Sequence, residues 1–275
     1  MPFLYLKIGC AKRLRTSAVT LYHKVIAVKE VILEKLKSIE YQFDVKILYA
    51  CESGSRAWGF ASPNSDFDVR FIYVHKMDYY LSIDDQRDVI ELPINDVLDI
   101  NGWELRKALR LFRKSNAPLY EWLQSPVVYY EDKSFAQSIR SLMPCHFSAR
   151  AGMHHYLSMA KGVLESELSG EMVRLKKYFY SLRPVLAAKW IADLNSVPPM
   201  DFKSLRMLMP EQFDGVVDEL LAIKANVDES FMIERHSDLN AYIDESIRYC
   251  EARVPAASSK GEDAEINKLF KKSIA

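Results

Sequence analysis

The sequence predicts an α+β fold, with a sheet in the front half of the chain and helices throughout the back half. Short apolar, β-rich runs occur before about residue 135, and helical periodicity dominates after it. Hydrophobic residues make up 49% of the 275 residues, which is enough for a sizeable core and too many for a disordered chain.

The front half alternates helical and extended signals. Apolar residues recur at helical spacing from Val25 to Ile39, and the run from Val45 to Ala50 is short, apolar and β-rich, as buried strands are. Gly54 ends this strand. The elements expected after it are a helical turn over 56–60, strands over 68–75, 88–93 and 97–100, and an amphipathic helix over 102–114.

The back half shows helical spacing of apolar residues in five stretches. They cover residues 147–168, 172–193, 203–208, 211–226 and 239–253. Ala, Ser, Gly and charged residues then dominate the chain, as they do in linkers. The expected division is an N-terminal extension over 1–22, a sheet-bearing domain over 23–135, a helical domain over 136–254 and a flexible tail over 255–275.

Charge and cysteine usage exclude several classes of protein. Lys+Arg and Asp+Glu both total 37, so no overall positive charge attracts nucleic acid, although a local basic groove is compatible with this balance. The four cysteines are scattered, without zinc-finger spacing. No stretch approaches the roughly 18–20 uncharged apolar residues that span a bilayer, so we expect a soluble, cytoplasmic protein without a membrane partner.

Two carboxylates stand at the start of the second predicted strand. Asp66 and Asp68 are two residues apart, and side chains at i and i+2 of a strand point to the same side. Such a pair can hold one or two hard cations such as Mg²⁺, whose remaining ligands are commonly substrate phosphates. The pattern therefore indicates a metal site.

A glycine and a serine follow the preceding strand. Gly54 lets the backbone approach a phosphate closely, and the amides of the turn can bind nucleotide phosphates together with the Ser55 hydroxyl. Arg56 can add a charge-assisted hydrogen bond. A D-x-D near a turn and a Gly-Ser pair are each common in plain loops, but both together between two buried strands are much rarer.

A third carboxylate is needed to share the metal or to activate the attacking hydroxyl. The acidic candidates on the following strands are Asp88, Glu91, Asp96 and Asp99. We favour Asp99, because apolar residues flank it and a helix follows directly, and we hold Asp96 in reserve. The alternative role for Asp99 is that of a turn or helix-capping residue.

The residues around these motifs resemble a known family. The stretches that carry the resemblance are 52–60 (ESGSRAWGF), 65–74 (SDFDVRFIYV), 99–108, 115–116 and 177–184. They are similar to the RNA-ligase-associated nucleotidyltransferases of the DNA polymerase β superfamily, and the similarity extends over residues 25–250.

The resemblance implies a small mixed β-sheet domain of the polymerase β type, followed by a helical domain. It implies that Asp66, Asp68 and Asp99 form a catalytic triad that binds Mg²⁺ or Mn²⁺, with phosphates at Gly54 and Ser55. It also implies transfer of a nucleoside monophosphate from a nucleoside triphosphate, ATP or CTP, to a hydroxyl, with release of pyrophosphate. The expected acceptor is an RNA end in RNA repair. A protein acceptor, as in antitoxin-like adenylylation, and a non-catalytic nucleotide- or RNA-binding module are the alternatives.

Basic and aromatic side chains gather on the predicted helix 172–193. Lys177, Tyr180 and Arg183 are spaced to lie near one another, and such a face can bind the nucleotide, with Tyr180 stacking on the base. The alternative is a solvated basic face with half-buried tyrosines. The basic face of the predicted helix 102–114 can likewise follow an RNA backbone or simply be solvated.

Overall fold

The computed structural model describes residues 28–84, 86–93, 97–256 and 263–275. The chain divides into two compact units, Met1–Lys46 and Ile47–Ala275. In the first unit a helix covers residues 28–43, and its buried side chains Ile32, Leu36 and Ile39 recur at helical spacing. The predicted extension over 1–22 lies outside the described residues.

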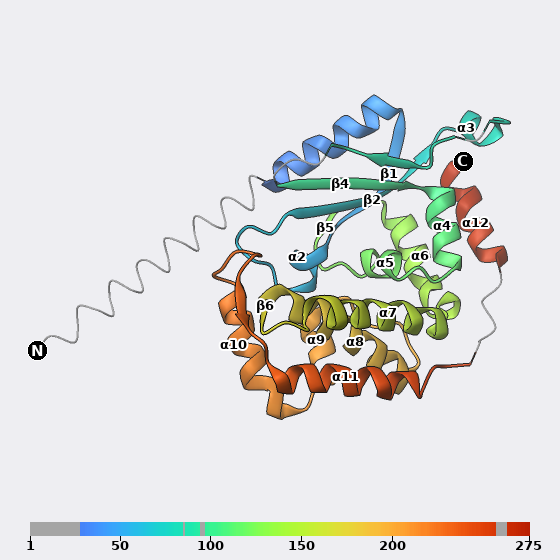
Figure 1. The fold of residues 1–275 in the computed structure, drawn as a ribbon. Coiled ribbons are helices and arrows are strands. Elements are labelled where there is room, and N and C mark those ends of the chain that lie inside the picture. Colours follow the sequence, from blue (N-terminus) through green and yellow to red (C-terminus); the bar gives the residue numbers. More distant parts are fainter. Residues whose placement is uncertain (1–27, 85, 94–96, 257–262) are drawn as a thin grey trace, which may run out of the picture. The chain divides into compact units, whose positions relative to one another are not determined.

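A five-stranded sheet carries the predicted motifs. Its strands are β1 (Val45–Ser53), β2 (Phe67–His75), β3 (Val89–Glu91), β4 (Leu98–Glu104) and β5 (Val128–Glu131), in the order β3-β4-β2-β1-β5. β2 and β4 are parallel, whereas β3 is antiparallel to β4 and β1 is antiparallel to β5. A mixed sheet followed by helices confirms the predicted α+β class (Figure 1).

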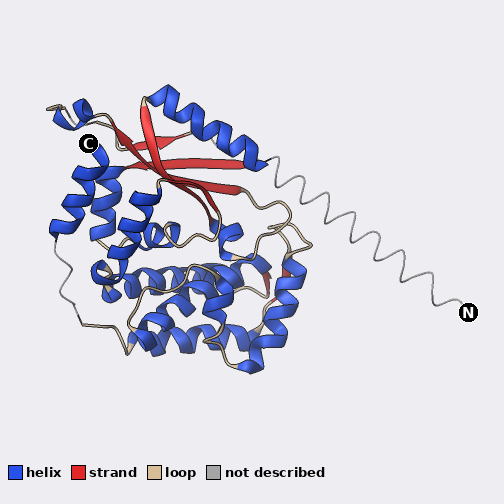
Figure 2. Ribbon diagram, turned by 180° about the vertical axis from the view of Figure 1, so that it is seen from behind, coloured by secondary structure: helices blue, strands red, loops and turns tan. Residues whose placement is uncertain are grey.

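Helices surround and follow this sheet. Those that alternate with the strands or pack beside them are α2 (Gly54–Trp58), α3 (Met77–Leu81), α4 (Leu105–Arg113), α5 (Ala117–Trp122), α6 (Lys133–His146) and α12 (Asp263–Ile274). The helical layer consists of α7 (Ala149–Glu167), α8 (Leu175–Leu194), α9 (Phe202–Arg206), a 3₁₀ turn (Glu211–Phe213), α10 (Asp214–Lys224) and α11 (Ser237–Glu251). A two-stranded sheet, β6 (Met172–Arg174) with β7 (Met232–Glu234), joins this layer. In Figure 2, which shows the molecule from behind, the helical layer and the five-stranded sheet lie on opposite sides of the second unit.

The second unit has two hydrophobic cores. One core packs α4, α5, α6 and α12 against the sheet, and it contains Leu48, Ile72 and Phe112. The other core lies within the helical layer around Phe179. Phe60, which follows α2, belongs to this second core, so the segment after β1 connects the sheet to the helical layer.

The boundary between β4 and α4 differs from the sequence prediction. We expected the helix to begin at Gly102, but β4 continues to Glu104 and α4 begins at Leu105. Gly102 lies opposite Phe71 on β2, and a Cβ atom at residue 102 would lie 2.2 Å from the Phe71 ring. The glycine therefore makes room for an aromatic ring inside the sheet instead of ending the strand. The short strands β5, β6 and β7 were not predicted.

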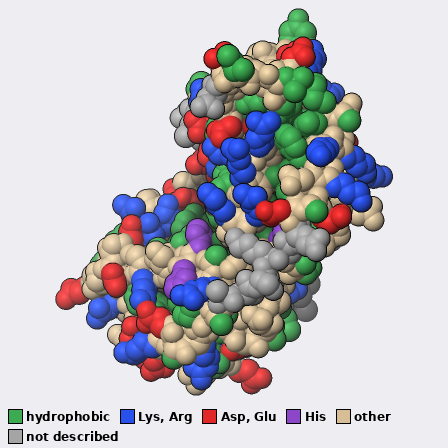
Figure 3. Space-filling view, turned by 90° about the vertical axis from the view of Figure 1, so that its right-hand side faces the viewer, with side chains coloured by type: hydrophobic (Ala, Val, Ile, Leu, Met, Phe, Trp, Pro, Cys, Tyr) green, Lys and Arg blue, Asp and Glu red, His purple; other side chains and the backbone are tan. Residues whose placement is uncertain are grey.

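The last part of the expected flexible tail is a helix. Residues 263–274 form α12, and its side chains Ile266 and Leu269 are buried in the core beneath the sheet. Arg113 on α4 forms an ion pair with Asp263 at 3.0 Å, which joins the two helices at one end. The side of the molecule on which α4 and α12 lie faces the viewer in Figure 3.

Among the helices of the described residues, none combines the length and the apolar character required to cross a membrane.

Candidate active site

The turn at Gly54 brings the end of β1 into contact with the start of β2. Gly54 has φ +63°, and a Cβ atom built on it would lie 2.1 Å from Oδ2 of Asp68. Any side chain at residue 54 would therefore collide with this carboxylate. The predicted phosphate-binding turn and one predicted metal ligand are direct neighbours, as the sequence spacing indicated.

Aromatic side chains hold α2 in place from the helical layer. Phe60 stacks on Phe179 of α8 with ring centroids 5.2 Å apart, and Trp58 meets Tyr180 edge to face at 5.6 Å. These contacts fix the short helix that begins with Gly54 and the buried Ser55. The position of the predicted phosphate site therefore depends on packing between the sheet and α8.

The parallel pairing of β2 and β4 places two of the predicted carboxylates side by side. Asp68 and Asp99 are direct register partners, although they are 31 residues apart in the sequence. One guanidinium bridges them: Arg70 Nη2 lies 3.2 Å from Oδ1 of Asp68 and 2.7 Å from Oδ2 of Asp99. Asp66 lies just before β2 with an exposed side chain.

The group of carboxylates is electrostatically crowded. Burial raises the pKa of Asp68 above its ordinary value, and the nearby Asp99 and Asp66 act in the same direction, against the opposing effect of Arg70. Within the described part of the chain, no three His, Cys, Asp or Glu side chains are grouped as a metal site. Arg70 instead supplies the positive charge between Asp68 and Asp99.

A buried glutamate behind Asp68 was missed by the sequence analysis. Glu52 is 1% exposed, accepts a hydrogen bond from the backbone N–H of Asp68 at 2.8 Å, and accepts another from the Tyr129 hydroxyl on β5. Burial raises the pKa of Glu52 to about 7. The side chain therefore joins three strands immediately behind the predicted site. A carboxylate within the otherwise apolar β1 was the signal for it.

The loop between α2 and β2 is attached to the helical layer by charged groups. Glu229, which precedes β7, accepts hydrogen bonds from the Ser65 hydroxyl at 2.7 Å and from Lys176 Nζ at 2.8 Å. Lys224 is 1% exposed and donates to the Ser62 hydroxyl at 2.8 Å. Although burial opposes it, Lys176 and Ser65 hold the pKa of Glu229 below its ordinary value. No pattern in the sequence points to these partners, because they are more than 100 residues from the loop.

Two of the predicted nucleotide-binding residues have structural partners near the site. Arg56 donates to the backbone carbonyls of Asp66 and Ser65 at 3.0 and 2.6 Å, so it holds the loop that carries Asp66. Lys177 forms an ion pair with Glu167 at 2.8 Å.

Tyr180 lies close enough to the carboxylates to feel their charge. Burial, together with the charges of Glu229, Asp68 and Asp66, raises the pKa of Tyr180 to about 12. Its ring contacts Trp58 on α2, so it lies beside the predicted phosphate site.

The structure corrects the expectation that Arg183 reaches a phosphate. Arg183 is 2% exposed, forms an ion pair with Glu121 at 2.8 Å, and donates to the carbonyl of Met200 at 3.0 Å. Its guanidinium also lies 4.4 Å from the ring centroid of Trp58. Arg183 therefore supports α2 from within the core and is not available to a ligand.

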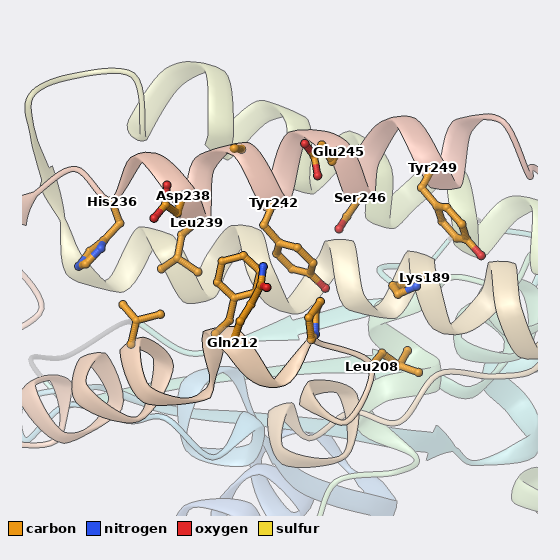
Figure 4. Close-up of a pocket in the computed structure, with 14 residues that line it drawn as sticks. Lys189, Leu208, Gln212, His236, Asp238, Leu239, Tyr242, Glu245, Ser246 and Tyr249 are labelled. Atoms are coloured by element: carbon orange, nitrogen blue, oxygen red, sulfur yellow. The ribbon is translucent and has the colours of Figure 1, made fainter.

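The two other acidic candidates that the structure describes have partners of their own. Asp88 pairs with Lys107 at 2.9 Å, Glu91 pairs with Arg87 at 3.3 Å, and Asp96 lies outside the described residues. A cavity of about 870 Å³ lies elsewhere, between α8, α11 and the segment around Leu208 (Figure 4). None of the predicted site residues lines it among the described residues.

A family model described as the RNA repair pathway DNA polymerase beta family, RlaP, matches residues 28–272. The chain belongs to this family. The match confirms the resemblance to RNA-ligase-associated nucleotidyltransferases, and it places the chain in the polymerase β superfamily of nucleotidyltransferase-like proteins.

The chain is similar to a protein of Bacillus subtilis strain 168. The uncharacterised protein YcgL is 45% identical over 250 residues, which cover 90% of this chain and 96% of YcgL. A solved structure, the nucleotidyltransferase-like protein from Exiguobacterium sibiricum 255-15, is 10% identical, and the match covers 88% of this chain and 79% of that protein. Its TM-score of 0.27 is too low to support an argument about this site.

Replacing Gly54 by Ala is expected to reduce nucleotidyl transfer by about a hundredfold, because Asp68 would have to move by about 1 Å. Gly59→Ala is the matched control. Gly59 also has a positive φ, +91°, but a Cβ atom there would meet nothing within 4 Å. Transfer rates of the two variants separate the effect of the collision from that of backbone strain. Equal rates for Gly54→Ala and Gly59→Ala would contradict a role for the close approach.

Proposed function

We propose that the protein is a divalent-metal-dependent nucleotidyltransferase that transfers a nucleoside monophosphate from a nucleoside triphosphate to the terminal hydroxyl of an RNA. The observation that carries this proposal is the contact between Gly54 and Asp68. The absent side chain at residue 54 allows the turn after β1 to approach a carboxylate that lies beside Asp99. A triphosphate on this turn would lie directly against the acidic group.

Three carboxylates would supply oxygen ligands to a hard divalent cation, although in the described residues they are not grouped as a preformed metal site. Asp66, Asp68 and Asp99 would provide the carboxylate oxygens that Mg²⁺ and Mn²⁺ accept. Burial is the main cause of the raised pKa of Asp68, and the charges of Asp99 and Asp66 add to it against the effect of Arg70, so a cation would relieve this carboxylate. Arg70 would give up part of its contact with these oxygens when a cation enters. When bound, the cation would neutralise charge on the phosphates during transfer.

The first turn of α2 is suited to the phosphates. Ser53, which precedes the helix, makes no capping hydrogen bond through its side chain, so that side chain does not occupy the first amides of the turn. These N–H groups and the Ser55 hydroxyl would bind phosphate oxygens. Tyr180, which packs against Trp58 beside the turn, would contact the nucleoside.

The remaining groups would position the acceptor. Asp99 would orient the attacking hydroxyl or accept its proton, since it lies beside Asp68 at the edge where the triphosphate binds. Arg70 would hold Asp99 in place through its backbone carbonyl, to which Nη1 donates at 3.0 Å. The RNA acceptor is supported by the description of the family as part of an RNA repair pathway.

The test is an incubation of the protein with each of four α-labelled nucleoside triphosphates, Mg²⁺ or Mn²⁺, and an RNA oligonucleotide. We expect label to enter the RNA only when a divalent cation is present and the 3′ hydroxyl is intact. The control is the same RNA with its 3′ terminus oxidised by periodate. The proposal would be overturned if no nucleotide labels the RNA with either metal, or if the label enters protein instead.

A further inference from the structure

A group of cationic side chains follows the end of β4 that is remote from Asp99. Arg106, Arg110 and Arg113 occupy successive turns of α4, and together with Asn267 of α12 they line a pocket of about 310 Å³. Leu109, Ile266 and Phe270 form the remainder of its lining. Within the residues that the structure describes, no carboxylate belongs to this lining.

The arginines of the pocket differ in how they are held. The Arg106 guanidinium lies 5.0 Å from the ring centroid of Tyr80 and 5.4 Å from that of Phe270, and Arg113 is paired with Asp263. Arg110 is exposed, and no acidic partner binds it in the described part of the chain. An unpaired guanidinium between two fixed ones is suited to bind an anion, because it offers several donors at no cost in broken ion pairs.

One wall of the pocket is α12, which lies within the expected C-terminal tail. α12 packs on α4 through Ile266 and Leu269, and it places Asn267 opposite the arginine row. Its exposed side also carries Lys271, and Lys268, whose Nζ lies 3.9 Å from the carboxylate of Glu265. Figure 3 shows Lys and Arg side chains gathered on the side of the molecule where α4 and α12 lie. With a net charge of zero for the whole chain, this is a local concentration of positive charge.

The arginines of the pocket lie at a distance from the candidate active site that a single-stranded nucleic acid can span. Asp99 and Glu104 are five residues apart on β4, and α4 begins at the next residue, so the arginine row starts about 17 Å from Asp99 along the strand. A nucleoside triphosphate at Gly54 would not reach so far. A polymer with a phosphate at every few ångströms would reach both places.

We propose that the pocket between α4 and α12 binds phosphate groups of the RNA strand whose end is the acceptor. That this RNA is the acceptor rests on the proposed function. That its phosphates bind here rests on the pocket alone. The arginines read charge and not base identity, so the pocket holds RNA of any sequence and orients its end towards the carboxylates.

The test measures binding of fluorescently labelled 20-nucleotide RNAs, one rich in U and one rich in A, without nucleotide or divalent cation. Arg110→Glu is expected to weaken binding of both RNAs to the same extent and to reduce the slope of log affinity against log salt by about 1. Lys203→Glu, which makes the same charge change at an exposed residue on α9, is the control and is expected to bind as the wild type does.

Three results would overturn the inference. They are binding by Arg110→Glu with the wild-type affinity and slope, an effect on only one of the two RNAs, and equal competition by a polyglutamate of matched charge. Label transfer to a dinucleotide acceptor, which is too short to reach the pocket, separates this inference from the proposed function. Arg110→Glu should transfer to it at the wild-type rate if both hold. If the wild type transfers no label but Arg110→Glu still loses RNA binding, the inference about the pocket stands and the proposed transferase activity is rejected.

Discussion

Asp68→Asn is expected to reduce nucleotidyl transfer by more than about a hundredfold without lowering the stability of the protein. Removing a residue that only hydrogen-bonds to a metal ligand typically lowers metal affinity or activity by about 10–100-fold. Asp68 is proposed as a ligand itself, so its loss should have a larger effect. The substitution keeps the shape of the side chain but removes a charge that burial, Asp99 and Asp66 all disfavour. The melting temperature should therefore stay the same or rise while activity disappears.

The matched control for this substitution is Asp88→Asn. Asp88 was an acidic candidate in the sequence, but it pairs with Lys107 and its side chain is 49% exposed, so the change should affect neither transfer nor stability by much. The two measurements are the rate of label transfer to RNA and the thermal unfolding midpoint. Wild-type transfer by Asp68→Asn would reject the proposed role of this carboxylate, and a marked fall in its midpoint would reject the argument from charge crowding.

Arg183→Met is expected to lower the free energy of unfolding by about 3–5 kcal/mol, because it leaves a buried carboxylate without its cation. The carboxylate is Glu121, which is 7% exposed and, among the described residues, would keep the hydrogen bond from the Tyr156 hydroxyl at 2.8 Å but no cation. Chemical denaturation measures the change. Arg248→Met is the control, since Arg248 pairs with Asp244 on the surface and should change the stability by less than about 1 kcal/mol.

The double variant Arg183→Met with Glu121→Gln separates loss of the ion pair from loss of packing. Removing both charges leaves no uncompensated carboxylate, so the double variant should be more stable than Arg183→Met alone. Equal stability of the two variants would show that the contact of the guanidinium with Trp58, and not the ion pair, carries the effect.

The part of the site that is local in the sequence was predictable. Gly54 with Ser55 and the pair Asp66 and Asp68 each lie on a short segment, and the spacing indicated that the turn and Asp68 are neighbours. That Asp66 and Asp68 share a face stays a prediction, because Asp66 lies just before β2. Arg70 was within reach of the same reasoning, because it is two residues after Asp68 on one strand. The neighbouring position of Asp99, by contrast, depends on the register between β2 and β4.

The prediction for Arg183 failed for a physical reason. Apolar residues occur on all sides of α8, and buried positions run through most of its length. A helix of this kind is enclosed by the core, so its periodicity does not show which face meets a ligand. Glu229 could not be found either, because its importance depends on contacts between distant segments. Glu52 did have a signal, its carboxylate within a mostly apolar strand, but the hydrogen bond to Asp68 that makes it important depends on the fold.

The hydrogen bonds from Glu229 and Lys224 to the loop before β2 have a consequence for the dynamics of the site. Ser62 and Ser65 are both buried, and each is bonded to a residue of the helical layer. Opening of the loop therefore requires these buried contacts to break, so its amide hydrogens should exchange with solvent as slowly as those of the surrounding helices. The loop is ordered when the chain folds, and an arriving nucleotide does not have to meet the entropic cost of ordering it.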